Sequence, residues 1–279
     1  HNAVTRPLAA LGAQVSVAAA PLFQPAAVTA AFDRLIVPGT DAVICNHVSN
    51  VFGFVQPVEA IAAICREREV PFIIDASQSA GMLTLDMTAL GAAFIAMPGH
   101  KGLYGPQGTG VLLCGQDVST RTLLEGGTGS LSEQQAMPDF LPDRLEAGTH
   151  NMPGIAGLLA GVRFVRQLGP EAICAEERQL AALAAEGLRR IPGLRVYALP
   201  DMAAQTGVLS VVPEHLDAEA LGNALAERGI AVRAGLHCAP LAHRTAGTLD
   251  TGSVRISFSH WNTREEVHRL LAAIGEICQ

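Results

Sequence analysis

Residues Val70-Pro-Phe-Ile-Ile-Asp75-Ala-Ser-Gln78-Ser-Ala-Gly81 indicate the fold of this chain most directly. The apolar residues of this stretch favour a β-strand, and the strand ends in an aspartate that is followed by small residues. In open α/β sheets, ligands bind beyond the carboxyl ends of the strands. We therefore expect Asp75 and Gln78 to lie at a ligand site. A helix N-cap or turn residue is the alternative interpretation of Asp75.

A second informative stretch, Pro98-Gly-His-Lys101-Gly-Leu-Tyr-Gly-Pro106, follows another apolar run. Its glycines and prolines predict a rigid loop that places the side chain of Lys101, the only lysine of the chain, rather than burying it. A free lysine amine has a pKa near ~10.4, so it is a poor nucleophile at neutral pH until its surroundings lower that value. The alternative is an ordinary solvated lysine.

Asp75 and Lys101 together point to an aldehyde cofactor. A lysine amine captures an aldehyde as a Schiff base. Pyridoxal phosphate also needs an acid beside its pyridinium nitrogen, because the acid keeps the ring protonated and makes it an electron sink. We therefore predict that these two residues hold pyridoxal 5'-phosphate.

The first half of the chain alternates strand and helix patterns. We predict strands over residues 14–19, 41–46, 72–75, 93–97 and 110–114, and helices over 25–35 and 58–68. This alternation implies a mostly parallel sheet covered by helices. Residues 115–150 are polar and rich in glycine, which predicts a long functional loop.

The second half has a different pattern. A helical stretch from 153 to 190 is broken near Gly169-Pro170, and strands are predicted over 194–199, 207–212, 230–233 and 253–257, with helices over 218–228 and 263–278. These spacings predict a smaller α+β domain. We expect an α/β protein with a large cofactor-binding domain at 1–152, and with a linking helix and small C-terminal domain at 153–279.

Composition excludes several classes of function. The 279 residues are 49% hydrophobic and 16% charged, with a net charge of −7, so they form a globular core and show no basic excess for nucleic acid. No apolar run reaches the ~18 residues of a membrane span. Six cysteines without C-x-x-C spacing argue against a metal site and a disulfide framework. A reducing cytoplasmic location is the expectation.

Two further residues carry chemistry. Cys238 lies in Gly235-Leu-His-Cys-Ala-Pro240, a loop that would expose it as a nucleophile; a buried small residue is the alternative. The neighbouring His237 is a candidate helper, although adjacency in sequence does not establish a hydrogen bond. Arg255 lies between apolar residues of a predicted strand, so its guanidinium needs an anion, and its planar fork suits an α-carboxylate.

Seven motifs in order along the chain resemble class V aminotransferase-fold enzymes, in particular cysteine desulfurases of group II, which include the selenocysteine lyases. These motifs are His1-Asn2-Ala3, residues 48–53, Asp75-Ala-Ser-Gln78-Ser, Gly99-His100-Lys101, Glu146-Ala-Gly-Thr149, residues 233–240 and residues 254–266. The resemblance implies the fold type I of pyridoxal phosphate-dependent transferases, with an incomplete large domain.

The resemblance also implies a role for each matching residue. Lys101 and Cys238 would be catalytic, with His1 stacked on the pyridine ring and Asp75 at the ring nitrogen. Gln78 would bond the ring hydroxyl oxygen, Asn50 would lie near that oxygen or the substrate carboxylate, and Arg255 would bind the carboxylate. His100 and Thr149 would contact the phosphate, Thr149 from the neighbouring subunit of a homodimer. The remaining histidines are interpreted as structural or surface residues: His47, His150, His215, His243, His260 and His268.

The activity implied is conversion of L-cysteine to L-alanine, with the sulfur carried as a persulfide on Cys238 and passed to an acceptor protein. Selenocysteine lyase, or another class V lyase or aminotransferase, is the first alternative. A truncated, non-catalytic scaffold without cofactor is the second. It is motivated by the longer N-terminal part of related proteins, which normally includes a phosphate-binding helix N-terminus, and by Pro98 and His150, where relatives carry other residues.

Overall fold

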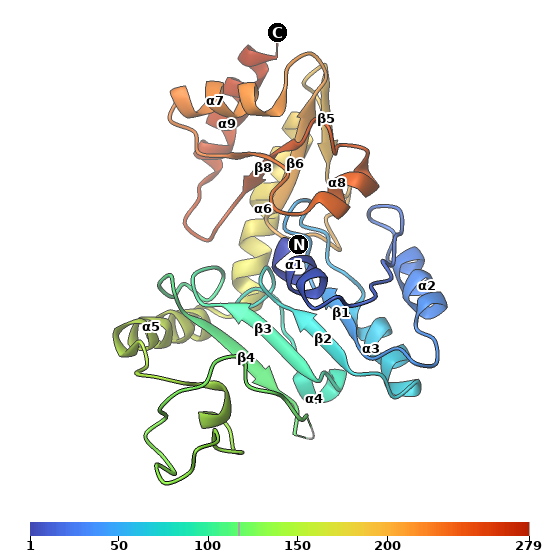
Figure 1. Cartoon of the computed structure of the whole chain (residues 1–279). Coiled ribbons are helices and arrows are strands. Elements are labelled where there is room, and N and C mark those ends of the chain that lie inside the picture. The colour runs from blue at the N-terminus through green and yellow to red at the C-terminus, as the bar shows by residue number, and fades with distance from the viewer. Residues whose placement is uncertain (117, 279) are drawn as a thin grey trace.

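The computed structural model describes residues 1–116 and 118–278, and these form two four-stranded sheets (Figure 1). The first sheet has the order β1-β2-β3-β4. Its strands are β1 (Val43–Asn46), β2 (Phe72–Asp75), β3 (Phe94–Pro98) and β4 (Gly110–Cys114). β1, β2 and β3 are parallel, and β4 runs antiparallel to β3. The predicted α/β class with a mostly parallel first sheet is therefore confirmed.

Helices α2 (Pro25–Leu35), α3 (Val58–Glu67) and α4 (Met87–Leu90) belong to this first unit. Helix α3 follows Pro57 and buries Val58, Ile61 and Cys65, which lie on one face at helical spacing. These side chains share a core with the apolar residues of β1 and β2. The core does not include Asp75 at the carboxyl end of β2 or Lys101 in the loop after β3.

The second sheet has the order β5-β6-β8-β7 and is antiparallel throughout. Its strands are β5 (Leu194–Tyr197), β6 (Val208–Pro213), β7 (Arg233–Gly235) and β8 (Ser253–Ser257). Helices α6 (Pro170–Leu188), α7 (Ala218–Glu227) and α9 (Arg264–Ile277) supply the apolar core that covers it. α9 begins with a capping box in which Thr263 and Glu266 bond each other's backbone N–H groups.

Two helices link the units. Helix α5 (Met152–Leu168) is followed by Gly169, which has a positive φ of 87° that glycine adopts without strain. Helix α6 starts at the next residue. α6 runs from beside the first sheet to the second (Figure 1). The predicted break near Gly169-Pro170 is thus present. The boundary expected between residues 152 and 153 falls at the start of α5, and the division into two domains stays a prediction.

A short segment after β1, residues 49–54, contacts the second sheet through hydrogen bonds, and we call it the seam. The Gln205 side chain donates to the carbonyls of Phe52 (3.0 Å) and Val208 (2.9 Å), so it ties the seam to β6. Gly53 has φ +65°, and a Cβ there would lie 2.1 Å from the Val208 carbonyl oxygen. Only glycine permits this approach, so the seam is held tightly against the second sheet.

Several local features differ from the sequence-based predictions. Residues 14–19 form no strand; Val15 and Val17 are exposed, so no neighbouring strand buries their alternating pattern. Helices α1 (Asn2–Ala10), α4 and α8 (Pro240–Ala246) were not predicted. Strand β7 begins at Arg233 rather than at residue 230, because pairing with β8 starts there. In the part of the chain that the structure describes, no helix is both long enough and apolar enough to cross a bilayer.

Candidate active site

Asp75 and Lys101 come from neighbouring parallel strands. Asp75 is the last residue of β2, and Lys101 follows β3 by three residues. The strands are in register, with Asp75 opposite Ala96, so both residues emerge at the same sheet edge. The Asp75 carboxylate accepts a hydrogen bond from the Ser77 N–H (2.9 Å), which orients it at the start of the turn that carries Gln78.

Two glycines bring the lysine loop against the turn after β2. A Cβ on Gly81 would lie 1.9 Å from the Gly102 carbonyl oxygen, and a Cβ on Gly102 would lie 2.3 Å from the Ala80 carbonyl oxygen. The two backbones therefore touch where any side chain would keep them apart. The Gly105 N–H donates to the Gly99 carbonyl (2.7 Å) and closes the loop around Lys101.

The surroundings of Lys101 change the pKa of its amine. Desolvation by the surrounding protein lowers the pKa of the Lys101 amine, the Asp75 carboxylate acts in the opposite direction, and Arg255 lowers the pKa further. The residue as a whole still reaches solvent. A lowered pKa leaves more of the amine neutral, as nucleophilic attack on an aldehyde requires.

Arg255 reaches the same place from the other sheet. It lies in the middle of β8, and its guanidinium donates to the Asn50 carbonyl (3.0 Å). Its Nε is buried and has no hydrogen-bond partner among the residues that the structure describes. Burial and the neighbouring Arg233 lower the pKa of Arg255. A half-buried arginine whose Nε donor is unused is a site for an anion such as a carboxylate.

Cys238 is exposed on the loop between β7 and α8, as predicted from its glycine-flanked motif. Both His237 (φ 50°) and Cys238 (φ 56°) adopt left-handed backbone conformations. The Asn50 side chain donates to the His237 carbonyl (2.8 Å). Because Arg255 bonds the Asn50 carbonyl, this one asparagine connects the guanidinium to the cysteine loop.

The N-terminal helix lies beside the same loop, between the two sheets (Figure 1). The Asn2 N–H donates to the Cys238 carbonyl (2.7 Å). His1 is exposed and caps α1, because its Nδ1 accepts from the Ala3 N–H (3.0 Å). The structure thus places His1 next to the cysteine loop. Nothing in the sequence alone indicated the contact made by Asn2.

The remaining predicted residues differ in position. Gln78 is half-buried in the turn after Asp75, and His100 is exposed beside Lys101. Thr149 is exposed in the long loop before α5, where Gly148 bonds Gly127 and His150 pairs with Glu146 (3.1 Å). In the described part of the chain, neither Gly148 nor His150 forms a hydrogen bond or an ion pair with the loop that carries Lys101. Its predicted contact from a neighbouring subunit stays a prediction.

The donor set fits the pyridine ring of pyridoxal phosphate and the α-carboxylate of an amino-acid substrate. It offers an amine with a lowered pKa, a carboxylate at the adjacent strand end, and a half-buried arginine with an unused, buried Nε donor. At the phosphate end the described residues offer the exposed His100, while Pro98 supplies no N–H.

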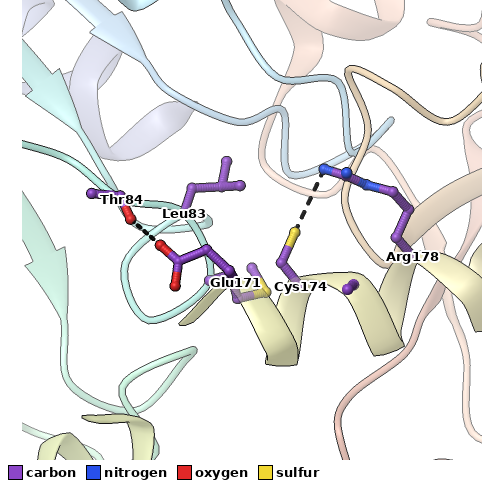
Figure 2. A pocket seen from close by; sticks show the side chains of 7 residues that line it. Leu83, Thr84, Glu171, Cys174 and Arg178 are labelled. Atoms are coloured by element: carbon purple, nitrogen blue, oxygen red, sulfur yellow. Dashed lines mark hydrogen bonds between the residues drawn. The ribbon is translucent and has the colours of Figure 1, made fainter. Parts of the chain in front are cut away.

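A separate hollow of about 380 Å³ lies beside α6 and holds none of these residues (Figure 2). Its walls are tied together by internal contacts: the Thr84 hydroxyl donates to the Glu171 carboxylate, and the Arg178 guanidinium contacts the Cys174 thiol (3.6 Å). The Thr84 contact links the turn after β2 to α6.

The chain is similar to known proteins over most of its length. The family model described as aminotransferase class-V matches residues 1–270. The chain is 37% identical over 252 residues to a probable cysteine desulfurase from Mycolicibacterium paratuberculosis, covering 89% of this chain and 36% of that protein. It is 35% identical over 252 residues to a probable cysteine desulfurase from Xylella fastidiosa, covering 88% of this chain and 59% of that protein.

Solved structures give the same picture. The apo structure of a cysteine desulfurase from Thermococcus onnurineus matches with a TM-score of 0.83 and 30% identity, over 98% of this chain and 68% of that one. A cysteine desulfurase from Escherichia coli matches with a TM-score of 0.79 and 27% identity, over 89% of this chain and 61% of that one. By contrast, the chain spans only 36% and 59% of the length of the two curated relatives.

Proposed function

This chain belongs to the aminotransferase class-V family, and from that premise we propose that it is a pyridoxal phosphate-dependent cysteine desulfurase. The reaction would convert L-cysteine to L-alanine and leave the sulfur on Cys238. The proposal rests on the two hydrogen bonds of Asn50. Its carbonyl accepts from Arg255, which has an unused donor for an anion. Its side chain donates to the carbonyl of His237, in the loop that exposes Cys238. The names of the matched relatives support the same reaction class.

The chain's own residues divide the work between substrate and proton. The Arg255 guanidinium would bind the substrate α-carboxylate and orient the α-carbon. The Lys101 Nζ, with its pKa lowered by desolvation, would accept the α-proton. The Asp75 carboxylate would hold a proton on the ring nitrogen. When bound, pyridoxal phosphate supplies an aldehyde for Lys101 and a ring that withdraws electrons from the substrate.

Cys238 would take the sulfur. Its thiolate attacks the substrate sulfur, so an S–S bond forms as the C–S bond breaks, and the electron pair of the broken bond stays on the carbon that becomes the methyl group of alanine. The step needs no outside oxidant. The exposure of Cys238 leaves the persulfide within reach of a sulfur-acceptor protein.

The remaining residues complete the proposed site. His1 would stack on the pyridine ring, Gln78 would bond its hydroxyl oxygen, and Asn50 would lie beside it. His100 would contact the phosphate, and Thr149 would do so from the other subunit of a homodimer. Asn50 has the clearest structural support of these, because its contacts to Arg255 and His237 already fix its position.

Substitution of the cysteine tests the proposal. Cys238→Ala should abolish sulfide and persulfide production from L-cysteine and keep the absorbance of bound pyridoxal phosphate. Cys278→Ala, a change of a half-buried thiol at the end of α9, is the matched control and should retain activity. Sulfur release that persists in Cys238→Ala would contradict the assignment of the nucleophile.

Borohydride trapping separates an enzyme from a scaffold without cofactor. Because Lys101 is the only lysine, reduction in the presence of pyridoxal phosphate should give a single pyridoxyl-lysine peptide that contains residue 101. Absence of this adduct would favour the scaffold. Parallel assays with L-cysteine, cysteine sulfinate and selenocysteine then distinguish the desulfurase from a selenocysteine lyase, which would use the same residues.

A further inference from the structure

We propose that Gln205 and Ser210 are positioning residues that hold the seam where its asparagine reaches both the substrate-binding arginine and the cysteine loop. That asparagine, Asn50, bonds Arg255 and the His237 carbonyl. The side chains of Gln205 and Ser210 are completely buried, and each bonds a seam carbonyl beyond Asn50. The inference rests on the proposed function only for its effect on catalysis, because the placement of the seam is argued from hydrogen bonds.

The seam uses its own N–H groups internally. The Ser49 hydroxyl accepts from the N–H groups of Val51 (3.3 Å) and Phe52 (3.2 Å). The Ser49 carbonyl accepts from the Gly53 N–H (2.9 Å). Residues 50–52 form a turn rather than a strand, and residues 51–53 are buried. Buried carbonyls need donors, so those of the seam depend on donors from another part of the molecule.

Four successive carbonyls of the seam each accept a hydrogen bond from the second sheet or from the segment that leads into it. These bonds are Arg255 to Asn50 (3.0 Å), Ser210 to Val51 (2.6 Å), Gln205 to Phe52 (3.0 Å) and the Thr206 N–H to Gly53 (2.9 Å). Ser210 and Arg255 lie directly opposite each other on β6 and β8, so their side chains leave the same face of the sheet. Because the four acceptors are consecutive, a shift of the seam would misalign all of them together.

Gln205 holds the seam in a single orientation of its amide. Its Nε2 donates to the carbonyls of Phe52 (3.0 Å) and Val208 (2.9 Å), and its Oε1 accepts from the Leu199 N–H (2.6 Å). A flipped amide would set oxygen against two carbonyls and nitrogen against an N–H group, so the network fixes the side chain. The Gln205 backbone carbonyl also accepts from the Arg178 Nε (2.8 Å), which ties this anchor to α6.

Ser210 lies between the seam and the residue that holds the cysteine loop. Its hydroxyl donates to the Val51 carbonyl (2.6 Å), and its oxygen lies 3.4 Å from the Ser253 hydroxyl. The Ser253 carbonyl lies 3.1 Å from the His237 Nε2. His237 is therefore held through its ring by Ser253 and through its carbonyl by Asn50, and Ser210 contacts both supports or their neighbours.

The placement of Asn50 decides how Arg255 presents its guanidinium to an anion. The Arg255 Nη1 donates to the Asn50 carbonyl, whereas its buried Nε has no partner among the residues that the structure describes. The guanidinium is planar and rigid, so fixing one nitrogen limits the directions that the Nε edge can face. A displaced seam would misorient this edge and leave Asp75 and Lys101 untouched. The expected defect is weaker substrate binding with normal capture of the cofactor.

Amide hydrogen exchange tests the placement of the seam without any assay of activity. Ser210→Ala removes one donor at nearly constant size, and Gln205→Met removes two donors at similar volume. Each should speed exchange of the Gly53 and Thr206 amides on the order of tenfold and leave the amides of α9 unchanged, because only the seam opens more easily. Leu221→Ala, a core change on α7 away from the seam, is the matched control. It should speed exchange in α7 and α9 and spare the seam.

Kinetics of the enzyme loaded with pyridoxal phosphate test the effect on the site. Ser210→Ala should raise KM for L-cysteine about fivefold, lower kcat about twofold through the loosened cysteine loop, and leave borohydride trapping at Lys101 unchanged. In an Arg255→Gln background, the same change should raise KM by no more than about twofold, because the serine acts through the arginine. Leu221→Ala should leave KM unchanged in both backgrounds.

The outcomes separate this inference from the proposed function. Seam amides that exchange at the wild-type rate in Ser210→Ala would overturn it, as would equal acceleration in the seam and α9. A KM effect of Ser210→Ala that persists in full beside Arg255→Gln would also overturn it. Ser210→Ala decides alone if Gln205→Met does not fold. If exchange behaves as expected but the wild-type chain releases no sulfur from cysteine, the placement of the seam stands and the proposed desulfurase activity fails.

Discussion

The two sheets contribute to the candidate site in different ways. The first sheet delivers Asp75 and Lys101 from the ends of parallel strands, which all finish at one edge. The second is antiparallel, so its strand ends are divided between both edges. It contributes Arg255 from the middle of β8 and Cys238 from a loop with left-handed backbone. The direction of parallel strands is enough to bring functional side chains to one edge of a sheet. In the antiparallel sheet, tertiary contacts position the functional side chains.

The seam supplies those contacts. Asn50 bonds both the Arg255 guanidinium and the His237 carbonyl, and the Ser210 hydroxyl donates to the Val51 carbonyl (2.6 Å). The position of the second sheet's residues relative to Lys101 therefore depends on a few residues that follow β1. Substitutions in each sheet can show whether the two contributions fail separately.

The largest effect is expected from removal of the proposed reactive amine, which the first sheet contributes. Lys101→Ala should lower sulfur release by about a thousandfold or more, because no other lysine of the chain can replace it. The measurement is sulfide production with saturating pyridoxal phosphate. Retention of more than a small fraction of the activity would show that Lys101 is not the reacting amine.

Two glycine substitutions should separate the sheets. Gly81→Ala forces a Cβ to 1.9 Å from the Gly102 carbonyl, and Gly53→Ala forces one to 2.1 Å from the Val208 carbonyl, so each should destabilise folding by about 3 kcal/mol. Below the unfolding transition, Gly81→Ala should impair trapping of the cofactor at Lys101. Gly53→Ala should retain trapping and lose sulfur transfer to Cys238.

Gly108→Ala is the matched control for both variants. Its φ is +77°, but a Cβ there meets nothing within 4 Å, so only the conformational cost of about 1 kcal/mol remains. Chemical denaturation of the three variants checks the order. Equal losses of stability in all three would show that close backbone contact is not what these glycines provide.

A smaller effect is expected from the second sheet's cation. Arg255→Gln keeps an amide donor but removes the charged fork, so kcat/KM for L-cysteine should fall about a hundredfold, mostly through KM. Trapping at Lys101 should continue, since the first sheet is untouched. A loss confined to kcat would indicate that Arg255 does not bind the substrate carboxylate in the ground state.

The smallest effect concerns acid stability. Burial, Arg255 and His243 lower the pKa of His237 to about 4 from an ordinary value of 6.5, and Arg233 adds to this while the bond to Ser253 opposes it. Between these values the unfolded chain binds a proton that the folded chain does not, so stability is complete above pH 6.5 and falls toward pH 4. The loss from this group should reach about 2 kcal/mol at pH 5.

His237→Gln should flatten this dependence, whereas His268→Gln should preserve it, since His268 is exposed on α9. Denaturant unfolding at a series of pH values gives the comparison. An unchanged slope in His237→Gln would mean that other groups, such as the buried His47 and His243, carry the acid sensitivity.

Sequence reasoning succeeded where the signal was local. Strand β2 and its terminal Asp75 were predicted with the observed bounds, because apolar β-prone residues followed by small ones define both the strand and its end. It failed at residues 14–19, where alternating valines lie exposed without a partner strand. Helix α8 was missed because seven residues are too few to show a clear helical repeat of apolar residues. From the sequence, His243 in this helix was interpreted only as a structural or surface residue.

Residue types and their order along the chain were enough to determine the α/β class, the family and the candidates Lys101, Asp75, Cys238 and Arg255, because strand ends, glycine loops and isolated charges are local features. Only the tertiary structure decided that Asn50 joins the arginine to the cysteine loop and that the His237 ring bonds Ser253. Those relations depend on which segments meet after folding. Residues 50 and 237 are 187 positions apart, and nothing local in the chain encodes their meeting.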